Sequence, residues 1–301
     1  MAETVEIYDD RLGAIVPPDA SLHKLANGAV HSEGPVYFHE DDSVIWSDAH
    51  GNRLLRWSPT DNVTVLREPS DYQSGNYRDL EGRLVACSSG LRGIIRREHN
   101  GEWHVLVDRY QGKRLNSPND LVVKSDRTIW FTDPPYGITQ PNQGYGGEQE
   151  QPGSYVYRFD PSIDEIYPVI TDMVRPNGLA FSPDESLLYV SDTAAFNIPN
   201  GAHHLRVYDV VDGRWAKNGR VFAVIEPGLP DGFRVDEHGN IFISSEDSVQ
   251  IYAADGTRLG KILVPEVCAN LTFGGQEHQR LFITAGKSLY AIDLNTRGVQ
   301  L

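Results

Sequence analysis

The chain has 301 residues, of which 42 are acidic and 27 basic, so its formal net charge is −15. Nucleic acids and anionic membranes are bound through basic surfaces, so this charge argues against both as partners. No run approaches the roughly 20 apolar residues that a membrane-spanning helix needs. The first residues carry no basic and apolar leader, and only two cysteines, Cys87 and Cys268, are present. These features predict a cytoplasmic protein without disulfides.

A pattern of two strands recurs along the chain, and each copy opens with a polar residue. The openers, in chain order, are Glu33, Asn119, Asn177, Asp231 and Asn270. The second strands follow at 44–46, 128–131, 187–190, 240–243 and 280–283. The 86 residues between Glu33 and Asn119 leave room for a sixth unit, which is visible at 78–87.

Third and fourth strands can be read in most units. They are expected at 54–57, 63–66, 155–159, 205–208 and 249–252. The last unit has a strand at 288–292 and then runs out, so its outer strand is expected from residues 21–25. Residues 1–20 would then form an N-terminal extension.

Six units of about 40–50 residues, built from strands and tight turns, predict a β-propeller. We therefore expect an all-β fold, a six-bladed β-propeller of four-stranded antiparallel blades, with residues 1–301 as a single domain. A β-sandwich would not explain six similar units. In a propeller the first strand of each blade lines the central channel, so the openers should ring one mouth of that channel.

Four openers carry oxygen ligands: Glu33, Asn119, Asn177 and Asp231. Two carboxylates and two amide carbonyls suit a single hard divalent cation. Ca²⁺ is the first candidate, with Mg²⁺, Mn²⁺ and Zn²⁺ as alternatives. The competing interpretation is that Asn-Gly and Asp-Gly simply form turns before strands, but Glu33 has no turn-forming role.

The loops that leave the second strands return to the same mouth. Two of them, 132–153 and 192–204, are long, and long loops over the mouth of a scaffold usually serve function. The substrate contacts expected from these loops, together with Asn119, are His50, Tyr136, Asn197 and Glu246. For His50, as for other loop histidines, a solvated side chain is the commoner alternative.

Several motifs in the same order and spacing resemble the gluconolactonase family, which includes regucalcin (senescence marker protein). They are SEGPV at 32–36, SPNDLV at 117–122, TDPPYG at 132–137, RPNGLAFS at 175–182, PDGFRVD at 230–236 and ANLTFGG at 269–275. The resemblance implies a six-bladed propeller with one divalent cation at the channel mouth, which hydrolyses sugar lactones to aldonic acids. It places Glu33, Asn177 and Asp231 on the metal ligands, and Asn119 on a position that binds metal or substrate.

Two departures from the family motifs fall on the expected active face. Many bacterial lactonases carry Cys-Glu-His where this chain has Cys-Ser-Ser at 87–89, and Asn-Gly-Asn where it has Ser-Gly-Asn at 74–76. We expect these changes to affect the choice of small-molecule lactone more than metal binding.

In the expected chemistry the cation polarises the lactone carbonyl and Asp231 acts as the general base for the attacking water. Because metal coordination lowers the basicity of a ligand, Glu246 and Asp133 are alternative bases. Two other functions stay open: hydrolysis of aryl esters or organophosphates at the same site, and a non-catalytic Ca²⁺-binding propeller.

Overall fold

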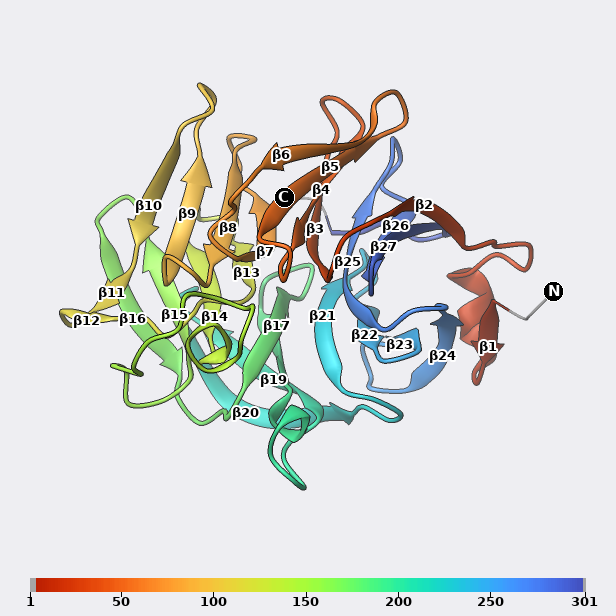
Figure 1. Cartoon of the computed structure of the whole chain (residues 1–301). Helices are drawn as coiled ribbons and strands as arrows, with labels where there is room; N and C mark the ends of the chain where they lie inside the picture. Colours follow the sequence, from red (N-terminus) through yellow and green to blue (C-terminus); the bar gives the residue numbers. More distant parts are fainter. Residues whose placement is uncertain (1–3, 300–301) are drawn as a thin grey trace.

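The computed structural model describes residues 4–299, and nearly all of its regular structure is β-strand arranged in a ring (Figure 1). Six antiparallel sheets surround a central axis, which confirms the predicted six-bladed β-propeller. Within the blades, neighbouring strands follow one another in sequence as hairpins, except where two strands of the N-terminal segment join the last two blades.

The first three blades run from residue 32 to residue 170. Blade 1 consists of β3 (Ser32–Phe38), β4 (Ser43–Asp48), β5 (Arg53–Ser58) and β6 (Asn62–Arg67). Blade 2 consists of β7 (Gln73–Arg78), β8 (Leu84–Ser88), β9 (Gly93–Arg97) and β10 (Trp103–Val107). Blade 3 consists of β13 (Leu121–Val123), β14 (Ile129–Asp133), β15 (Tyr155–Asp160) and β16 (Glu165–Ile170). A small hairpin of β11 (Arg109–Tyr110) and β12 (Lys113–Arg114) lies between blades 2 and 3.

The last three blades complete the ring. Blade 4 consists of β17 (Pro176–Phe181), β18 (Leu187–Asp192), β19 (His204–Val211) and β20 (Trp215–Val224). Blade 5 consists of β21 (Pro230–Val235), β22 (Ile241–Ser245), β23 (Ser248–Tyr252) and β24 (Arg258–Leu263). Blade 6 consists of β25 (Cys268–Gly274), β26 (Arg280–Ala285) and β27 (Ser288–Asp293) together with β2 (His23–Asn27). Three short helices, η1 (Asp10–Ala14), α1 (Tyr136–Thr139) and η2 (Ala194–Phe196), lie in connections.

The N-terminal segment joins the two blades at the end of the chain. β2 pairs with β27 as the outer strand of blade 6, so one blade is built from both ends of the described chain. β1 (Val5–Ile7) adds a fifth strand to blade 5 by pairing with β24. Leu12 of η1 is fully buried against blades 5 and 6, so the segment before residue 20 contributes to the core.

The core lies between the blades, because each sheet is apolar on both faces. Trp130 of blade 3 packs edge-on against Phe181 of blade 4, with ring centroids 5.3 Å apart. Tyr37 of blade 1 stacks on Phe282 of blade 6 at 5.8 Å. These aromatic residues at strand positions therefore join neighbouring blades.

The inner strands are irregular at the openers. In five blades the pairing of inner and second strand shifts there, for instance between Glu33 and Val36 and between Pro230 and Phe233. Such a bulge bends the strand and changes the direction of its side chains. A glycine follows because the next blade is close: a Cβ on Gly34 would lie 2.1 Å from the Ser74 carbonyl oxygen. Bulge and glycine together occur at three candidate ligands, Glu33, Asn177 and Asp231, whereas Asn119 has neither.

Candidate active site

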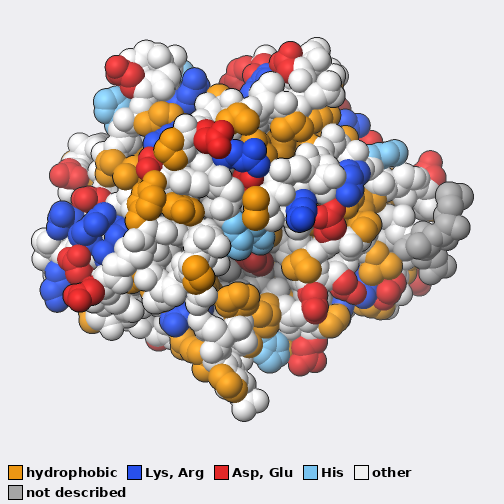
Figure 2. Space-filling model, viewed as in Figure 1, with side chains coloured by type: hydrophobic (Ala, Val, Ile, Leu, Met, Phe, Trp, Pro, Cys, Tyr) orange, Lys and Arg blue, Asp and Glu red, His pale blue; other side chains and the backbone are white. Residues whose placement is uncertain are grey.

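A cavity of about 440 Å³ lies at one mouth of the channel. Seven of the residues expected at the site line it: Glu33, His50, Asn119, Tyr136, Asn177, Asp231 and Glu246. Asn197 does not, and its neighbour Phe196 does. On the face shown in Figure 2, hydrophobic side chains gather around a hollow near the centre.

The wall of the cavity above its polar floor is largely apolar. Phe196, Leu229 and Val267 come from three different loops and line the cavity together. Phe196 and Val267 are among the most exposed large hydrophobic residues of the chain, at 59% and 61%. Apolar surface beside a few convergent polar groups is typical of a small-molecule site.

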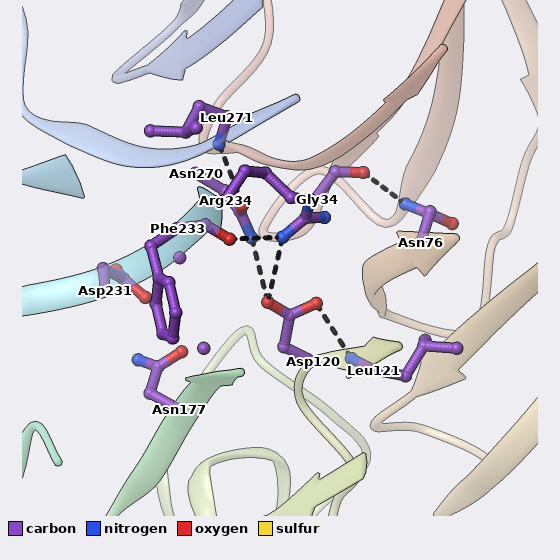
Figure 3. Close-up of polar contacts among 12 residues, drawn as sticks. Gly34, Asn76, Asp120, Leu121, Asn177, Asp231, Phe233, Arg234, Asn270 and Leu271 are labelled. Carbon is purple, nitrogen blue, oxygen red and sulfur yellow. Dashed lines mark hydrogen bonds and ion pairs between the residues drawn. The ribbon is translucent and has the colours of Figure 1, made fainter. Parts of the chain in front are cut away.

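Two carboxylates lie in the floor of the cavity under unfavourable electrostatic conditions. Burial raises the pKa of Glu33 well above its usual range, and the charges of Asp231 and Asp120 raise it further. Burial, and then Asp120, raise the pKa of Asp231 to about 7. The Asn177 side chain faces Asp231 and its hydrogen bond favours the charged form (Figure 3).

This donor set fits a hard divalent cation. Within residues 4–299 no group of three or more His, Cys, Asp or Glu side chains is placed to hold a metal ion. A cation here would therefore depend on the amide oxygens of Asn119 and Asn177 as well as on the two carboxylates. Carboxylate and amide oxygens are the ligands of Ca²⁺ and Mg²⁺. A bound cation would also relieve the repulsion between the acidic groups, since an opposite charge favours the ionised form.

A third carboxylate, Asp120, lies next to this floor and was not among the predicted site residues. It is 1% exposed, and its Oδ1 accepts a hydrogen bond of 2.9 Å from the Leu121 backbone N–H. Its Oδ2 lies 3.4 Å from Nδ2 of Asn270 and 4.0 Å from Nη1 of Arg234 (Figure 3). For Asp120 and Asn270 the sequence offers one signal, which is their position. Asp120 directly follows the opener Asn119, and Asn270 is itself an opener.

Hydroxyl groups on the second strands fix the openers of the neighbouring blades. Each donates to a backbone carbonyl of the next inner strand: Ser47 to Ser74 (2.8 Å), Thr132 to Asn177 (2.7 Å), Ser191 to Asp231 (3.0 Å) and Ser244 to Ala269 (2.7 Å). Two carbonyls held in this way belong to candidate metal ligands. The positions of Asn177 and Asp231 therefore depend on the blade that precedes each of them.

The residue after the hydroxyl is Asp in three blades, and it holds the loop that leads into the inner strand. Asp48 accepts from the backbone N–H groups of residues 30 and 31, and Asp192 from those of 174 and 175. Asp133 does the same for Asn116 and Ser117, at 2.8 and 2.9 Å. In this recurring pair, the Ser or Thr hydroxyl holds the next blade, and the Asp holds the loop that leads into the inner strand of its own blade.

Comparison with known proteins agrees with this architecture. The family described as SMP-30/gluconolactonase/LRE-like region matches residues 31–287. The chain belongs to this family. A curated relative, the gluconolactonase of Zymomonas mobilis, is 31% identical over 316 residues, covering 97% of this chain and 86% of the relative.

Solved structures show the same relationship. A gluconolactonase from Xanthomonas campestris is 41% identical, with a TM-score of 0.91 over 97% of this chain and 95% of that one. The calcium-binding protein regucalcin from Agrobacterium tumefaciens has a TM-score of 0.74 over 93% of this chain and 98% of that one. At 18% identity, regucalcin shows only that the fold is shared.

The two departures from the family motifs lie at the cavity. Ser74 and Ser89 both line it. The Ser74 hydroxyl is 3.4 Å from Nδ2 of Asn119, and the Ser89 hydroxyl donates to the Pro118 carbonyl at 3.4 Å. Both contacts reach the segment that carries Asn119, so the substitutions change the surroundings of a candidate ligand.

Of two further residues named in the sequence analysis, Asp133 lies outside the cavity and His50 lies in its lining. Asp133 is fully buried and does not line the cavity, and its two oxygens hold the backbone of residues 116 and 117. His50 does line the cavity and stacks on His31, with ring centroids 4.5 Å apart. Burial lowers the pKa of both imidazoles, that of His31 to about 4, so the pair is neutral at physiological pH.

Proposed function

We propose that this protein hydrolyses a lactone, with a sugar lactone converted to its aldonic acid as the first candidate reaction. We further propose that one divalent cation is held at the channel mouth, with Ca²⁺ as the first candidate. One observation carries the proposal: Glu33 and Asp231 lie with Asn119 and Asn177 in the floor of one cavity. The names of the Zymomonas and Xanthomonas relatives support the same reaction class. A pentonolactonase of Haloferax volcanii, 28% identical over 84% of this chain, does so as well.

Glu33, Asn177 and Asp231 would hold the cation, with Asn119 as a further ligand or as a contact to the substrate. When bound, such a cation supplies a Lewis acid that polarises the ester carbonyl. The chain's own residues then orient the reactants. Asp231 accepts a proton from the water that attacks the carbonyl carbon, because its carboxylate lies in the cavity beside the position of the cation and the substrate. The ring C–O bond breaks, and its oxygen takes up a proton as the hydroxy acid forms.

The remaining lining residues would position the lactone and limit its size. Tyr136 is fixed by a 2.6 Å hydrogen bond between its hydroxyl and that of Thr193, so its ring forms a rigid side of the cavity. Phe196 lies at its edge, with ring centroids 6.4 Å apart. Glu246, His50 and Ser74 would contact the polar groups of the substrate.

The proposal is tested with Asp231→Asn. This change keeps the shape of the side chain but removes the base and one negative charge. We expect hydrolysis of glucono-δ-lactone, followed with a pH indicator against the spontaneous rate, to fall at least about 100-fold. Circular dichroism should show an unchanged fold.

The matched control is Asp247→Asn, an exposed carboxylate next to Glu246 that does not line the cavity. It should retain wild-type activity. Full activity in Asp231→Asn would contradict the assignment of the base. A wild-type protein that binds Ca²⁺ but turns over neither aldono-lactones nor aryl lactones would contradict the proposed reaction.

A further inference from the structure

The channel has a second cavity at its other mouth. Its volume is about 410 Å³, and each of the six inner strands contributes two of its lining residues. None of the residues that line the first cavity lines this one. The two cavities are therefore separate sites at opposite ends of the same six strands.

The second cavity contains a buried guanidinium with an unused edge. Arg234 is 9% exposed, and its Nη1 donates a 2.7 Å hydrogen bond to the Phe233 carbonyl (Figure 3). The same atom lies 4.0 Å from Oδ2 of Asp120. The opposite edge, Nε and Nη2, has no hydrogen-bond acceptor among residues 4–299, neither atom is fully shielded from solvent, and Arg234 lines the cavity. A buried guanidinium has five donors to satisfy, so this edge is available to a ligand.

The orientation of this edge is fixed. The guanidinium lies over the Tyr77 ring, 5.7 Å from its centroid, and the bond to the Phe233 carbonyl holds its other side. A donor pair held in this way loses little conformational entropy when a ligand binds.

The charge of the lining favours an anion. The cavity is lined by Arg234 and by Arg78, which is paired with Glu40. Among residues 4–299 the lining has a single carboxylate, Glu185. That carboxylate is occupied, because it accepts from Lys124 at 3.0 Å and from the Ser125 backbone N–H at 2.7 Å. In a protein with a net charge of −15, a cavity lined in this way differs from its surroundings.

We propose that this second cavity binds a small carboxylate anion on the Nε–Nη2 edge of Arg234. Two parallel N–H donors match the two oxygens of a carboxylate. A single guanidinium edge, already near Asp120, matches one negative charge better than the greater charge of phosphate. A cavity of this size is in the range that holds small organic ligands, roughly 300–1,000 Å³.

Binding is measured by saturation-transfer NMR and calorimetry with acetate and benzoate as probes, neither of which is the aldonic acid product of the first cavity. We expect at least one probe to bind the wild-type protein, and to bind Asp231→Asn equally, because that change affects only the first cavity. Arg234→Gln should weaken binding at least about 10-fold, the loss of one charge-assisted bidentate contact.

A second variant provides an independent test in case Arg234→Gln does not fold. Gln276 is exposed and lines the mouth of the second cavity, so Gln276→Trp should block entry without disturbing the core. Glu277→Trp, on the same turn but outside the lining, is the matched control and should bind normally. Failure of all carboxylates to bind, binding of inorganic phosphate alone, or binding unchanged in both Arg234→Gln and Gln276→Trp would each overturn the proposal.

Discussion

Glu33 and Asp231 are ionisable groups placed where their negative charges are costly. Burial is the largest cause of the raised pKa of each, and neighbouring carboxylates add to it. Groups with such pKa values are concentrated at functional sites. The cost should therefore be visible in the stability of the protein when no cation is bound.

The first prediction concerns the pH dependence of that stability. The pKa of Asp231 is about 7 in the folded protein, above its usual 3.8. Between about pH 4 and pH 7 the unfolded chain loses this proton while the folded chain keeps it, so stability falls as pH rises through this range. In chelator-treated protein, Asp231→Asn should thus be more stable than wild type above pH 7, by on the order of 1–4 kcal/mol.

The measurement is urea unfolding at pH 4 and pH 8 in the presence of chelator. The two proteins should have similar stability at pH 4, because the folded carboxyl is protonated there and the pH is still close to the unfolded pKa of 3.8, so little of the difference has developed. Adding Ca²⁺ at pH 8 should stabilise wild type more than the variant. Asp212→Asn, on an exposed turn, should show neither effect. A variant less stable than wild type at pH 8 in chelator would contradict this account of the carboxylate.

Among the elements, the second strands of blades 3 and 4 hold two openers, Asn177 and Asp231, of the blades that follow. The Ser191 hydroxyl in β18 donates to the Asp231 carbonyl in β21, across the boundary between blades 4 and 5. It also lies 2.8 Å from the backbone N–H of Gly178, next to Asn177. One hydroxyl thus contacts the backbone at two candidate ligands.

Ser191→Ala should lower kcat roughly 10-fold to 100-fold, because small displacements of reacting groups are costly. It should lower stability by about 1 kcal/mol for each lost hydrogen bond. Ser191→Thr, which keeps the hydroxyl, should recover much of the activity. Ser182→Ala removes a comparable hydroxyl near the other end of β17 and should affect stability alone. Equal losses of kcat in Ser191→Ala and Ser182→Ala would show that the contact to Asp231 has no special role.

The loop that contains η2 should determine substrate affinity. Phe196 lines the cavity yet is 59% exposed, so its removal should cost little stability. Phe196→Ala is expected to raise KM about 3-fold to 10-fold with kcat nearly unchanged, because it removes apolar contact with bound substrate. Steady-state kinetics with Ile198→Ala, a change in the same loop outside the lining, provides the comparison. A fall in kcat at constant KM would argue against this role.

At the scale of the molecule, the ring is completed by β2, which supplies the outer strand of blade 6. Deleting residues 1–27 removes this strand and leaves β27 as an open edge. The midpoint of thermal unfolding should fall by roughly 10 °C or more. Deleting residues 1–8 removes only β1 from the outside of blade 5 and should cost much less. Equal midpoints for the two deletions would contradict this role of β2.

The repeat in the sequence was sufficient to predict the fold. Each opener precedes an inner strand, and propeller geometry places all inner strands around one channel, so the common cavity of Glu33, Asn119, Asn177 and Asp231 could be anticipated. The bulges at the openers could not be anticipated, because an alternating strand pattern shows which face of the sheet each side chain is on but not where the pairing between strands shifts.

Other features depend on contacts between distant blades. The choice between Asn197 and Phe196 as a lining residue is decided by how a loop folds back, which local sequence does not specify. Asp120 and Asp133 are both acidic residues near openers, yet one lies beside the floor of the cavity and the other holds backbone. The sequence does not predict the second cavity or the place of Arg234 in it, because both depend on the convergence of six inner strands at their other ends.

Glu33, Asn177 and Asp231, with Asn119 beside them, are proposed to hold the divalent cation needed for lactone hydrolysis, and the decisive experiment is to remove the metal and restore it. Protein is treated with chelator, its metal content is determined by elemental analysis, and glucono-δ-lactone hydrolysis is measured before and after adding Ca²⁺, Mg²⁺, Mn²⁺ or Zn²⁺. We expect activity to fall to the spontaneous rate in chelator and to return with about one cation bound per chain, and we expect Glu33→Gln to prevent the return. Full activity in protein shown to contain no metal would contradict it.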